Sequence, residues 1–267
     1  MRSRVPCPGD QAIERHLREW YQRPMGRTLS RAEQAHLDDI LPNLFGYHLL
    51  QVGSIGDRLF AASRILHRAV MAIGANQDVS DAALCAEPER LPISGDSLDA
   101  LILYHTLEFA QDPHQVLREA ERTLVPEGHV VVLGFNPRSP MGVRRMLHRR
   151  RNAVPWCGRF LSLPRLRDWL RLLGFDVVSC HRLFFLPPVQ RARLLERLGF
   201  LESWGRRWWP FMGGAYVLVG RKKVSTLTPI KPRWRPRRSI VSGLADPASQ
   251  NFLRSGVLRE WESNEQG

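Results

Sequence analysis

The feature that most constrains this chain is an alternation of strand patterns and helix patterns over residues 47–180. Two continuous apolar runs, 97–104 and 128–135, are typical of parallel strands that are covered on both faces. Between them, Asp112 and Pro113 mark a helix start, with the carboxylate as N-cap and proline at the first helical position. Repeated strand–helix units of this kind favour a doubly wound, mostly parallel sheet.

The remaining elements are predicted from apolar periodicity and from turn residues. Ser30 and Glu33 form a plausible capping box for the second of two N-terminal helices, and Pro126 and Gly128 are expected to stop the helix that begins at Asp112. The last two strands are expected to be antiparallel. Strands are predicted at 47–52, 69–73, 82–86, 175–180 and 214–220, and helices at 12–20, 30–41, 58–67, 141–150, 162–173 and within 189–209.

Length and composition indicate one α/β domain with appendages. The chain has 267 residues, of which 43% are hydrophobic and 24% charged, so a wholly disordered or fibrous chain is excluded. We expect an N-terminal helical segment at 1–46, the α/β domain at 47–223, and a basic, mostly irregular tail at 224–267. No apolar run approaches the roughly 20 residues of a membrane helix, and the N-terminus lacks a secretory pattern, so a cytoplasmic location is predicted.

Positive charge is concentrated in one third of the chain. Residues 138–238 hold 24 Lys and Arg residues and 4 acids, whereas residues 1–137 hold 13 and 18. Arginine pairs well with phosphates and carboxylates, although an arginine-rich genome would produce the same bias. The four cysteines are scattered without metal-ligand spacing, so no metal site is predicted.

An ordered set of short motifs resembles one known family. The motifs are Leu91-Pro92, Ser97-Leu98-Asp99, His105-Thr106-Leu107-Glu108, Asp112-Pro113, Leu117-Arg118-Glu119, Arg122, Leu124, Pro126 and Gly128. In this order and spacing they resemble the type 11 class I S-adenosylmethionine-dependent methyltransferases, firmly over residues 49–135 and more loosely to 220. The resemblance implies a Rossmann-like, seven-stranded methyltransferase sheet whose last strand is inserted antiparallel.

The resemblance also implies a set of cofactor-binding residues. Glycines after the first strand let backbone approach a ligand, because glycine has no Cβ and tolerates positive φ. By position in the family pattern, the cofactor-binding candidates are Gly53, Ser54, Gly56, Asp78, Glu87 and His105. His105 follows the clearest strand and is also the catalytic candidate, as a group that positions substrate or accepts a proton.

Each of these residues also has a simpler interpretation. The glycine pair can be an ordinary turn, Glu87 a solvated surface residue, and His105 a structural histidine bonded to backbone. The loop has one glycine fewer than the family pattern, and Asp78 is only a candidate for the acid that binds the ribose hydroxyls.

Basic residues supply the candidates for substrate and partner binding. Asn136, Arg138, Arg144 and Arg145 follow the strand at 128–135 and are predicted to hold an anionic substrate, with a solvated basic helix as the simpler alternative. Residues 206–238 interleave cations with tryptophan, a composition that can bind nucleic acid weakly by charge and stacking.

The sequence therefore leaves two functions open. The first is methyl transfer from S-adenosylmethionine to an unidentified acceptor. The second is a methyltransferase-like protein that has lost catalysis and binds RNA or a protein through its basic carboxyl third. A nicotinamide dehydrogenase is disfavoured, because the GxGxxG spacing is missing.

Overall fold

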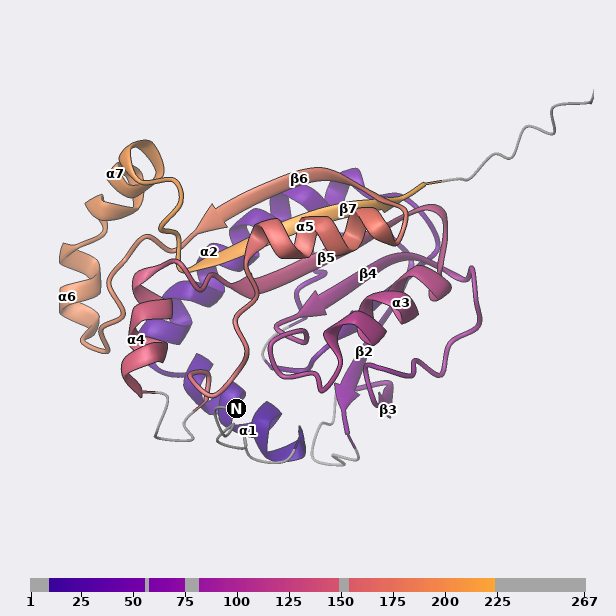
Figure 1. Cartoon of the computed structure of the whole chain (residues 1–267), viewed down its shortest axis with the longest axis horizontal. Coiled ribbons are helices and arrows are strands. Elements are labelled where there is room, and N and C mark those ends of the chain that lie inside the picture. The colour runs from indigo at the N-terminus through magenta and orange to yellow at the C-terminus, as the bar shows by residue number, and fades with distance from the viewer. Residues whose placement is uncertain (1–9, 56–57, 75–81, 149–153, 224–267) are drawn as a thin grey trace, which may run out of the picture. The chain divides into compact units, whose positions relative to one another are not determined.

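A computed structural model describes residues 10–55, 58–74, 82–148 and 154–223, which form a seven-stranded sheet with helices on both faces (Figure 1). The helices are α1 (Asp10–Tyr21), α2 (Pro24–Ile40), α3 (Pro113–Thr123), α4 (Pro140–His148), α5 (Leu163–Leu172), α6 (Ala192–Arg197) and α7 (Phe200–Trp208), with a short 3-10 helix at Leu41–Asn43. The strands are β1 (His48–Val52), β2 (His67–Ile73), β3 (Leu84–Ala86), β4 (Leu98–Tyr104), β5 (Leu124–Phe135), β6 (Phe175–Leu183) and β7 (Ala215–Lys222).

The strand order is β3-β2-β1-β4-β5-β7-β6. Strands β1 to β5 all run parallel to one another. Strand β7 is inserted between β5 and β6 and is antiparallel to both. The predicted doubly wound sheet and its antiparallel last pair are therefore confirmed. The chain first winds outward from β1 to β3 and then crosses to β4 and β5, so the topological switch point lies between β1 and β4, where α/β sheets bind their ligands.

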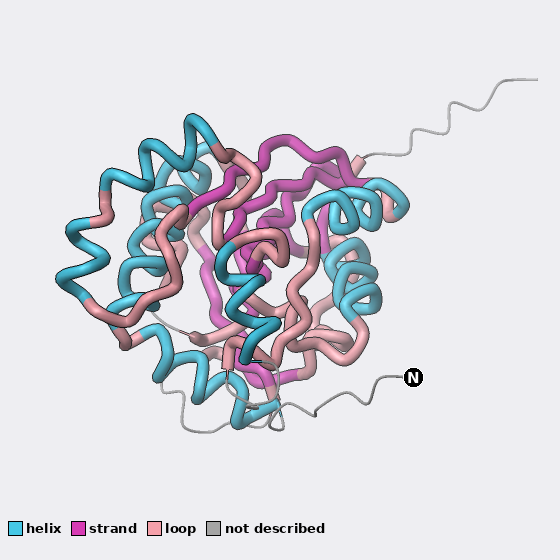
Figure 2. The backbone as a smooth tube through the Cα atoms, turned by 60° about the vertical axis from the view of Figure 1, so that its left-hand side comes forward, coloured by secondary structure: helices cyan, strands magenta, loops and turns pink. Residues whose placement is uncertain are grey.

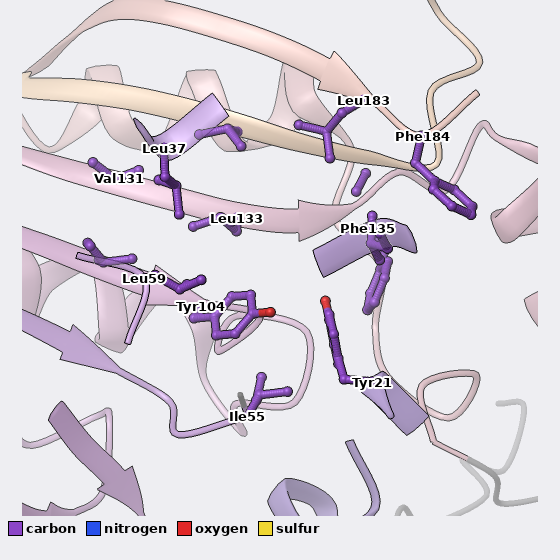
Figure 3. Close-up of a cluster of buried hydrophobic side chains, with 14 of the residues drawn as sticks. Tyr21, Leu37, Ile55, Leu59, Tyr104, Val131, Leu133, Phe135, Leu183 and Phe184 are labelled. Carbon is purple, nitrogen blue, oxygen red and sulfur yellow. The ribbon is translucent and has the colours of Figure 1, made fainter. Parts of the chain in front are cut away.

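Alternate residues of the central strands bury on opposite faces of the sheet. Ala100 and Ile102 of β4 join a cluster with the apolar residues of α1 and α2, whereas Leu101 and Leu103 join a second cluster with α3 and α5. Figure 2 shows the strands enclosed between these helices, and Figure 3 shows side chains of the first cluster. The N-terminal helices thus share one hydrophobic core with the sheet.

The helix predicted at 58–67 is wrong. Residues 58–66 form turns, and β2 begins at His67. Side chains from outside the segment form hydrogen bonds with backbone groups that would bond to each other in a helix. The Gln51 side-chain oxygen accepts from the N–H of Leu59 at 3.1 Å, and Arg68 donates to two carbonyls of the segment. Leu59 is still buried in the first cluster, so the apolar positions were recognised but their local conformation was not.

The predicted capping box is also wrong, because α2 begins earlier than expected. Pro24 occupies its first turn and Ser30 lies inside the helix. Glu33 is buried, with 1% of its surface exposed, and serves the site described below. The spacing of Ser30 and Glu33 suggested the N-terminus of a helix, but the Glu33 carboxylate instead forms tertiary contacts in the protein interior.

The third difference concerns Pro126 and Gly128. The helix ends at Thr123, and both residues lie inside β5, which begins at Leu124. The pairing of β5 with β4 shifts in register at this point, and Glu127 has a φ of 66°. A proline is tolerated within a strand at such an irregularity, because no regular ladder hydrogen bond is required of it there. The Asp112 cap is confirmed, since its carboxylate accepts from the N–H of His114 at 2.9 Å.

Candidate functional site

The site begins at Gly53, directly after β1. Its φ is +101°, and its N–H donates to the carbonyl of Met71 on β2 at 2.9 Å. A Cβ at this position would lie 2.8 Å from the carbonyl oxygen of Tyr104, at the end of β4. Only glycine therefore allows the ends of β1 and β4 to approach each other here.

A carboxylate from α1 covers the loop that follows Gly53. Glu14 is buried and accepts from the N–H of Ser54 and, at 2.7 Å, from its hydroxyl. The second oxygen of Glu14 accepts from the N–H of Ile73, the last residue of β2, at 3.3 Å. Arg18, one turn further along α1, donates to the carbonyl of Ser54 at 2.9 Å and to its hydroxyl at 3.1 Å. Helix α1 is thus fastened to the ends of β1 and β2 by two charged side chains.

A pocket lies between α1 and the ends of the parallel strands. It is a narrow, partly open cleft with a cavity volume of about 30 Å³, and its walls are largely apolar. Residues at or just after the carboxyl ends of β1, β2, β3 and β4 all contribute to it, as the switch-point rule predicts. Its lining residues are Ile13, Glu14, Leu17, Ile55, Ile73, Pro88, Glu89, His105, Thr106, Phe109, Ala110 and Gln111.

Behind this pocket, His105 is held between two buried carboxylates. Its Nε2 lies 2.9 Å from Glu33 of α2, and its Nδ1 lies 3.2 Å from Glu108. Two phenols, Tyr21 and Tyr104, donate to Glu33 at about the same distances, 3.2–3.3 Å and 3.2 Å. We call these five residues the His105 cluster. Its members come from α1, α2, β4 and the loop after β4, so the cluster fixes the N-terminal helices to the sheet.

The carboxylates decide the protonation state of His105. Burial opposes a charged imidazole, but the negative charges of Glu33 and Glu108 outweigh it and raise the pKa of His105 from 6.5 to about 9. Burial, together with Glu33, also raises the pKa of both Tyr21 and Tyr104, so the phenols remain donors. At neutral pH the imidazole is therefore charged, and both of its nitrogens donate.

His105 also has an unusual backbone conformation. Its φ is +49°, a region that non-glycine residues seldom adopt, and its ring stacks on Phe135 with centroids 4.1 Å apart. Such strain persists only where surrounding contacts hold it, and it is concentrated at functional sites. One oxygen of Glu108 is occupied by His105 and by the N–H of Phe135, whereas its buried Oε2 has no hydrogen-bond partner among the described residues.

The other predicted cofactor residues are placed less centrally. Ser54 lies under α1, bound to Glu14 and Arg18. Glu87 is exposed and does not line the pocket; two residues further on, Glu89 does, and it accepts from the N–H of Gln111 at 2.9 Å. Gly56 and Asp78 lie outside the described residues.

The predicted substrate residues make contacts within the protein. The Asn136 amide donates to the carbonyls of Phe211 and Gly213, both at 2.9 Å, and its oxygen accepts from the N–H of Arg138, whose side chain is exposed. Arg144 donates to the carbonyl of Pro188 and lies over the ring of Trp156, and Arg145 donates to Gly158 and lies over Phe160. The four residues thus fix the loop and helix after β5. Within the predicted nucleic-acid segment 206–238, residues 224–238 lie outside the described residues.

Sequence reasoning missed Glu14, Arg18 and Glu33. The one signal in the sequence was helical spacing: Glu14 and Arg18 are four residues apart on α1, so they lie on the same face of that helix. Within the described residues there is no group of histidine, cysteine or acidic side chains arranged to hold a metal ion. No described helix is long and apolar enough to cross a membrane.

Comparison with known proteins adds a family to this geometry. The profile of a family described as a methyltransferase domain matches residues 63–132. The uncharacterized protein YafS of Escherichia coli K12 is 32% identical over 211 residues, which cover 78% of this chain and 82% of YafS.

Solved structures show the same fold at low sequence identity. One is a Thermotoga maritima S-adenosylmethionine-dependent methyltransferase described as a possible histamine N-methyltransferase: 19% identity, TM-score 0.57, covering 79% of this chain and 98% of that one. Another is a putative methyltransferase of Haloferax volcanii in complex with the Trm112 activator: 17% identity, TM-score 0.53, covering 78% and 98%.

Proposed function

This chain belongs to the class I S-adenosylmethionine-dependent methyltransferases, and we propose that it binds its cofactor in the pocket between α1 and the strand ends and methylates an acceptor there. The observation that carries the proposal is the pocket itself. It lies at the topological switch point of the sheet and is lined by residues at or just after the carboxyl ends of β1, β2, β3 and β4.

The residues of the pocket fit the two chemically different ends of such a cofactor. Ile55, Ile73 and Phe109 give apolar walls that suit a flat nucleobase. At the α1 side Glu14 lines the pocket, and behind it the Ser54 N–H and hydroxyl bind the Glu14 carboxylate beside the Arg18 guanidinium. These groups would equally suit the amino-acid end of the cofactor. When bound, S-adenosylmethionine would supply the methyl group of its sulfonium to an attacking acceptor atom, and the sulfur would leave as the thioether of S-adenosylhomocysteine.

The chain itself contributes alignment and exclusion of water. Helix α1 closes the pocket over the loop after β1, and the His105 cluster fixes the end of β4 beneath it. Because both imidazole nitrogens donate to carboxylates at neutral pH, His105 has no lone pair with which to take a proton from an acceptor. We therefore assign His105 a positioning role. Rate enhancement would come from holding the methyl donor and the methyl acceptor close together and correctly aligned.

A transfer assay tests the proposal, since the fold alone does not name a reaction; the [4+2]-cyclase SpnF shares it at 15% identity and TM-score 0.50. The protein is incubated with methyl-labelled S-adenosylmethionine and fractionated bacterial extract. We expect label to enter one fraction in a protein-dependent way and to be suppressed by excess S-adenosylhomocysteine. If no fraction gains protein-dependent label, methyl transfer is contradicted.

Glu14 is expected to compete with the cofactor for the donors of Ser54. A Glu14→Ala substitution leaves these donors free, so a ligand no longer has to displace a carboxylate that accepts three hydrogen bonds. At about 1 kcal/mol net for one such bond, affinity for S-adenosylmethionine should rise roughly fivefold, as measured by calorimetric titration.

The matched control is Glu19→Ala, which removes an exposed carboxylate from the same helix and should leave affinity unchanged. A fall in affinity of the Glu14→Ala protein would show that Glu14 contacts the cofactor instead of competing with it.

A further inference from the structure

Helix α7 exposes a row of large aromatic side chains. Phe200, Trp204 and Trp208 are spaced four residues apart, so they lie on one face, and they are 56%, 59% and 67% exposed. Trp209 and Phe211 continue the row beyond the helix and are also exposed. We call these five residues the aromatic surface. Contiguous apolar surface of this kind is rare on proteins that have no partner.

The opposite face of α7 is attached to the body of the protein. The Glu202 carboxylate accepts from the backbone N–H groups of Phe184 and Phe185 at 3.0 and 2.8 Å. Gly205 packs so closely on Phe185 that an added Cβ would lie 2.5 Å from that side chain. The inner face is therefore fixed, and the aromatic surface is held outward in a defined orientation.

Helix α4 adds to the same end of the molecule. Figure 1 shows α4, α6 and α7 at the end of the molecule where β5 and β6 reach their carboxyl ends. Arg144 of α4 donates to the carbonyl of Pro188 in the segment that precedes α6. Val143, Met146 and Leu147 of α4 are all more than half exposed. Exposed apolar side chains are thus present on α4 as well as on α7 at this end of the molecule.

Positive charge surrounds these apolar side chains. Arg193, Arg197 and Arg207 are exposed on α6 and α7, and in the part of the chain that the structure describes none of them forms an ion pair. Glu202 is the one acid of α7, and its carboxylate is taken by two backbone N–H groups. A partner for this end is therefore expected to be both anionic and apolar.

We propose that α6 and α7 dock the protein on the surface of an anionic phospholipid bilayer. A helix whose exposed face carries tryptophan and phenylalanine with arginine beside them can lie in the plane of the membrane interface. Tryptophan rings prefer the headgroup level, and arginines near the surface are attracted to anionic lipids. The inference rests on the aromatic surface and its arginines, and it holds independently of methyl transfer.

The arrangement of the rings favours lipid over nucleic acid. Single-stranded nucleic acid binds by stacking successive bases on flat aromatic platforms. Here the rings of Phe200 and Trp204 are perpendicular, at 90° with centroids 6.4 Å apart, and so do not form a platform. Leu194 and Met212, which are also exposed, give aliphatic surface that suits acyl chains and has no counterpart in a polyanion.

Vesicle binding by the full chain tests the proposal. Phosphatidylcholine vesicles with and without one quarter phosphatidylglycerol are compared by co-sedimentation and by the blue shift of tryptophan emission. We expect the wild-type chain to bind the anionic vesicles at least tenfold more tightly. The double substitution W204S/W208S and the double substitution R197Q/R207Q should each weaken this binding at least tenfold.

The control is L66S/L172S, which removes two residues that are 74% and 79% exposed elsewhere, before β2 and at the end of α5. It should bind as wild type does. The proposal is overturned if the wild-type chain does not bind anionic vesicles, or if W204S/W208S binds them as tightly as wild type, which would place binding outside this surface. It is equally overturned if the tryptophan substitutions abolish RNA binding or self-association while vesicle binding is unchanged.

Discussion

Replacing Glu33 by glutamine is expected to lower the free energy of unfolding by about 3–5 kcal/mol near neutral pH. Glu33 is buried and accepts from the charged imidazole of His105 and from the phenols of Tyr21 and Tyr104. Removing one partner of a buried charge pair has measured costs in this range, and the imidazolium would then keep only Glu108 as a carboxylate neighbour. Glutamine has nearly the same shape, so the loss reports charge and not a cavity. Urea unfolding at pH 7 measures it.

The same cluster gives the wild-type protein a defined pH dependence. The pKa of His105 is about 9 in the folded protein, against 6.5 unfolded, so the folded state binds the proton more tightly. A shift of this size corresponds to roughly 3 kcal/mol of stability, present in full below about pH 6.5 and lost as pH rises through about 9. The Glu33→Gln protein should lose most of this dependence.

The control for both measurements is Glu119→Gln. Glu119 pairs with Arg122 at 2.7 Å, but the arginine is 40% exposed, so the expected cost is at most about 1 kcal/mol. Equal destabilisation by the two substitutions, or a wild-type stability that increases between pH 7 and 9, would contradict a charged His105 between carboxylates.

An Ala110→Trp substitution is expected to abolish cofactor binding, weakening it at least a hundredfold. Ala110 is half-buried in the pocket wall between α1 and the loop after β4. An indole there fills space in the pocket without changing a charged group. By contrast, a side chain at Gly53 would strain the fold, because that residue has positive φ and abuts the Tyr104 carbonyl, so Ala110 is the better test position. Equilibrium dialysis with labelled S-adenosylmethionine measures the loss.

Ala61→Trp is the matched control, since Ala61 is exposed in the turns before β2 and does not line the pocket. It should bind the cofactor as wild type does. If the Ala110→Trp protein keeps its fold, as judged by an unchanged melting transition, and still binds, the cofactor does not occupy this pocket.

Sequence patterns predicted those elements that are determined by residues close together in the sequence. The strands β4 and β5 are continuous apolar runs, and the Asp112-Pro113 pair marks the start of α3 because capping is a local interaction. The antiparallel β6 and β7 pair was also predicted. Segments whose backbone is satisfied by distant side chains were not: the turns at 58–66 depend on Gln51 and Arg68, neither of which lies within them.

The sequence predicted which edge of the sheet carries the site, but it did not predict the charged residues that the helices bring to that edge. Gly53 and His105 were identified because they follow strands. Glu14 and Glu33 lie on helices 91 and 72 residues before His105 in sequence, and their role depends on how those helices pack on the sheet, which no local spacing encodes. Glu33 shows the conflict directly, because its spacing from Ser30 fits a helix cap.

Calorimetric titration of the wild-type chain with S-adenosylmethionine, and separately with S-adenosylhomocysteine, tests most directly whether the pocket at the switch point is a cofactor site. We predict one molecule bound per chain, with micromolar dissociation constants for both ligands and a matching rise in melting temperature. The absence of heat and of any thermal shift with either ligand would contradict a working cofactor site in this fold.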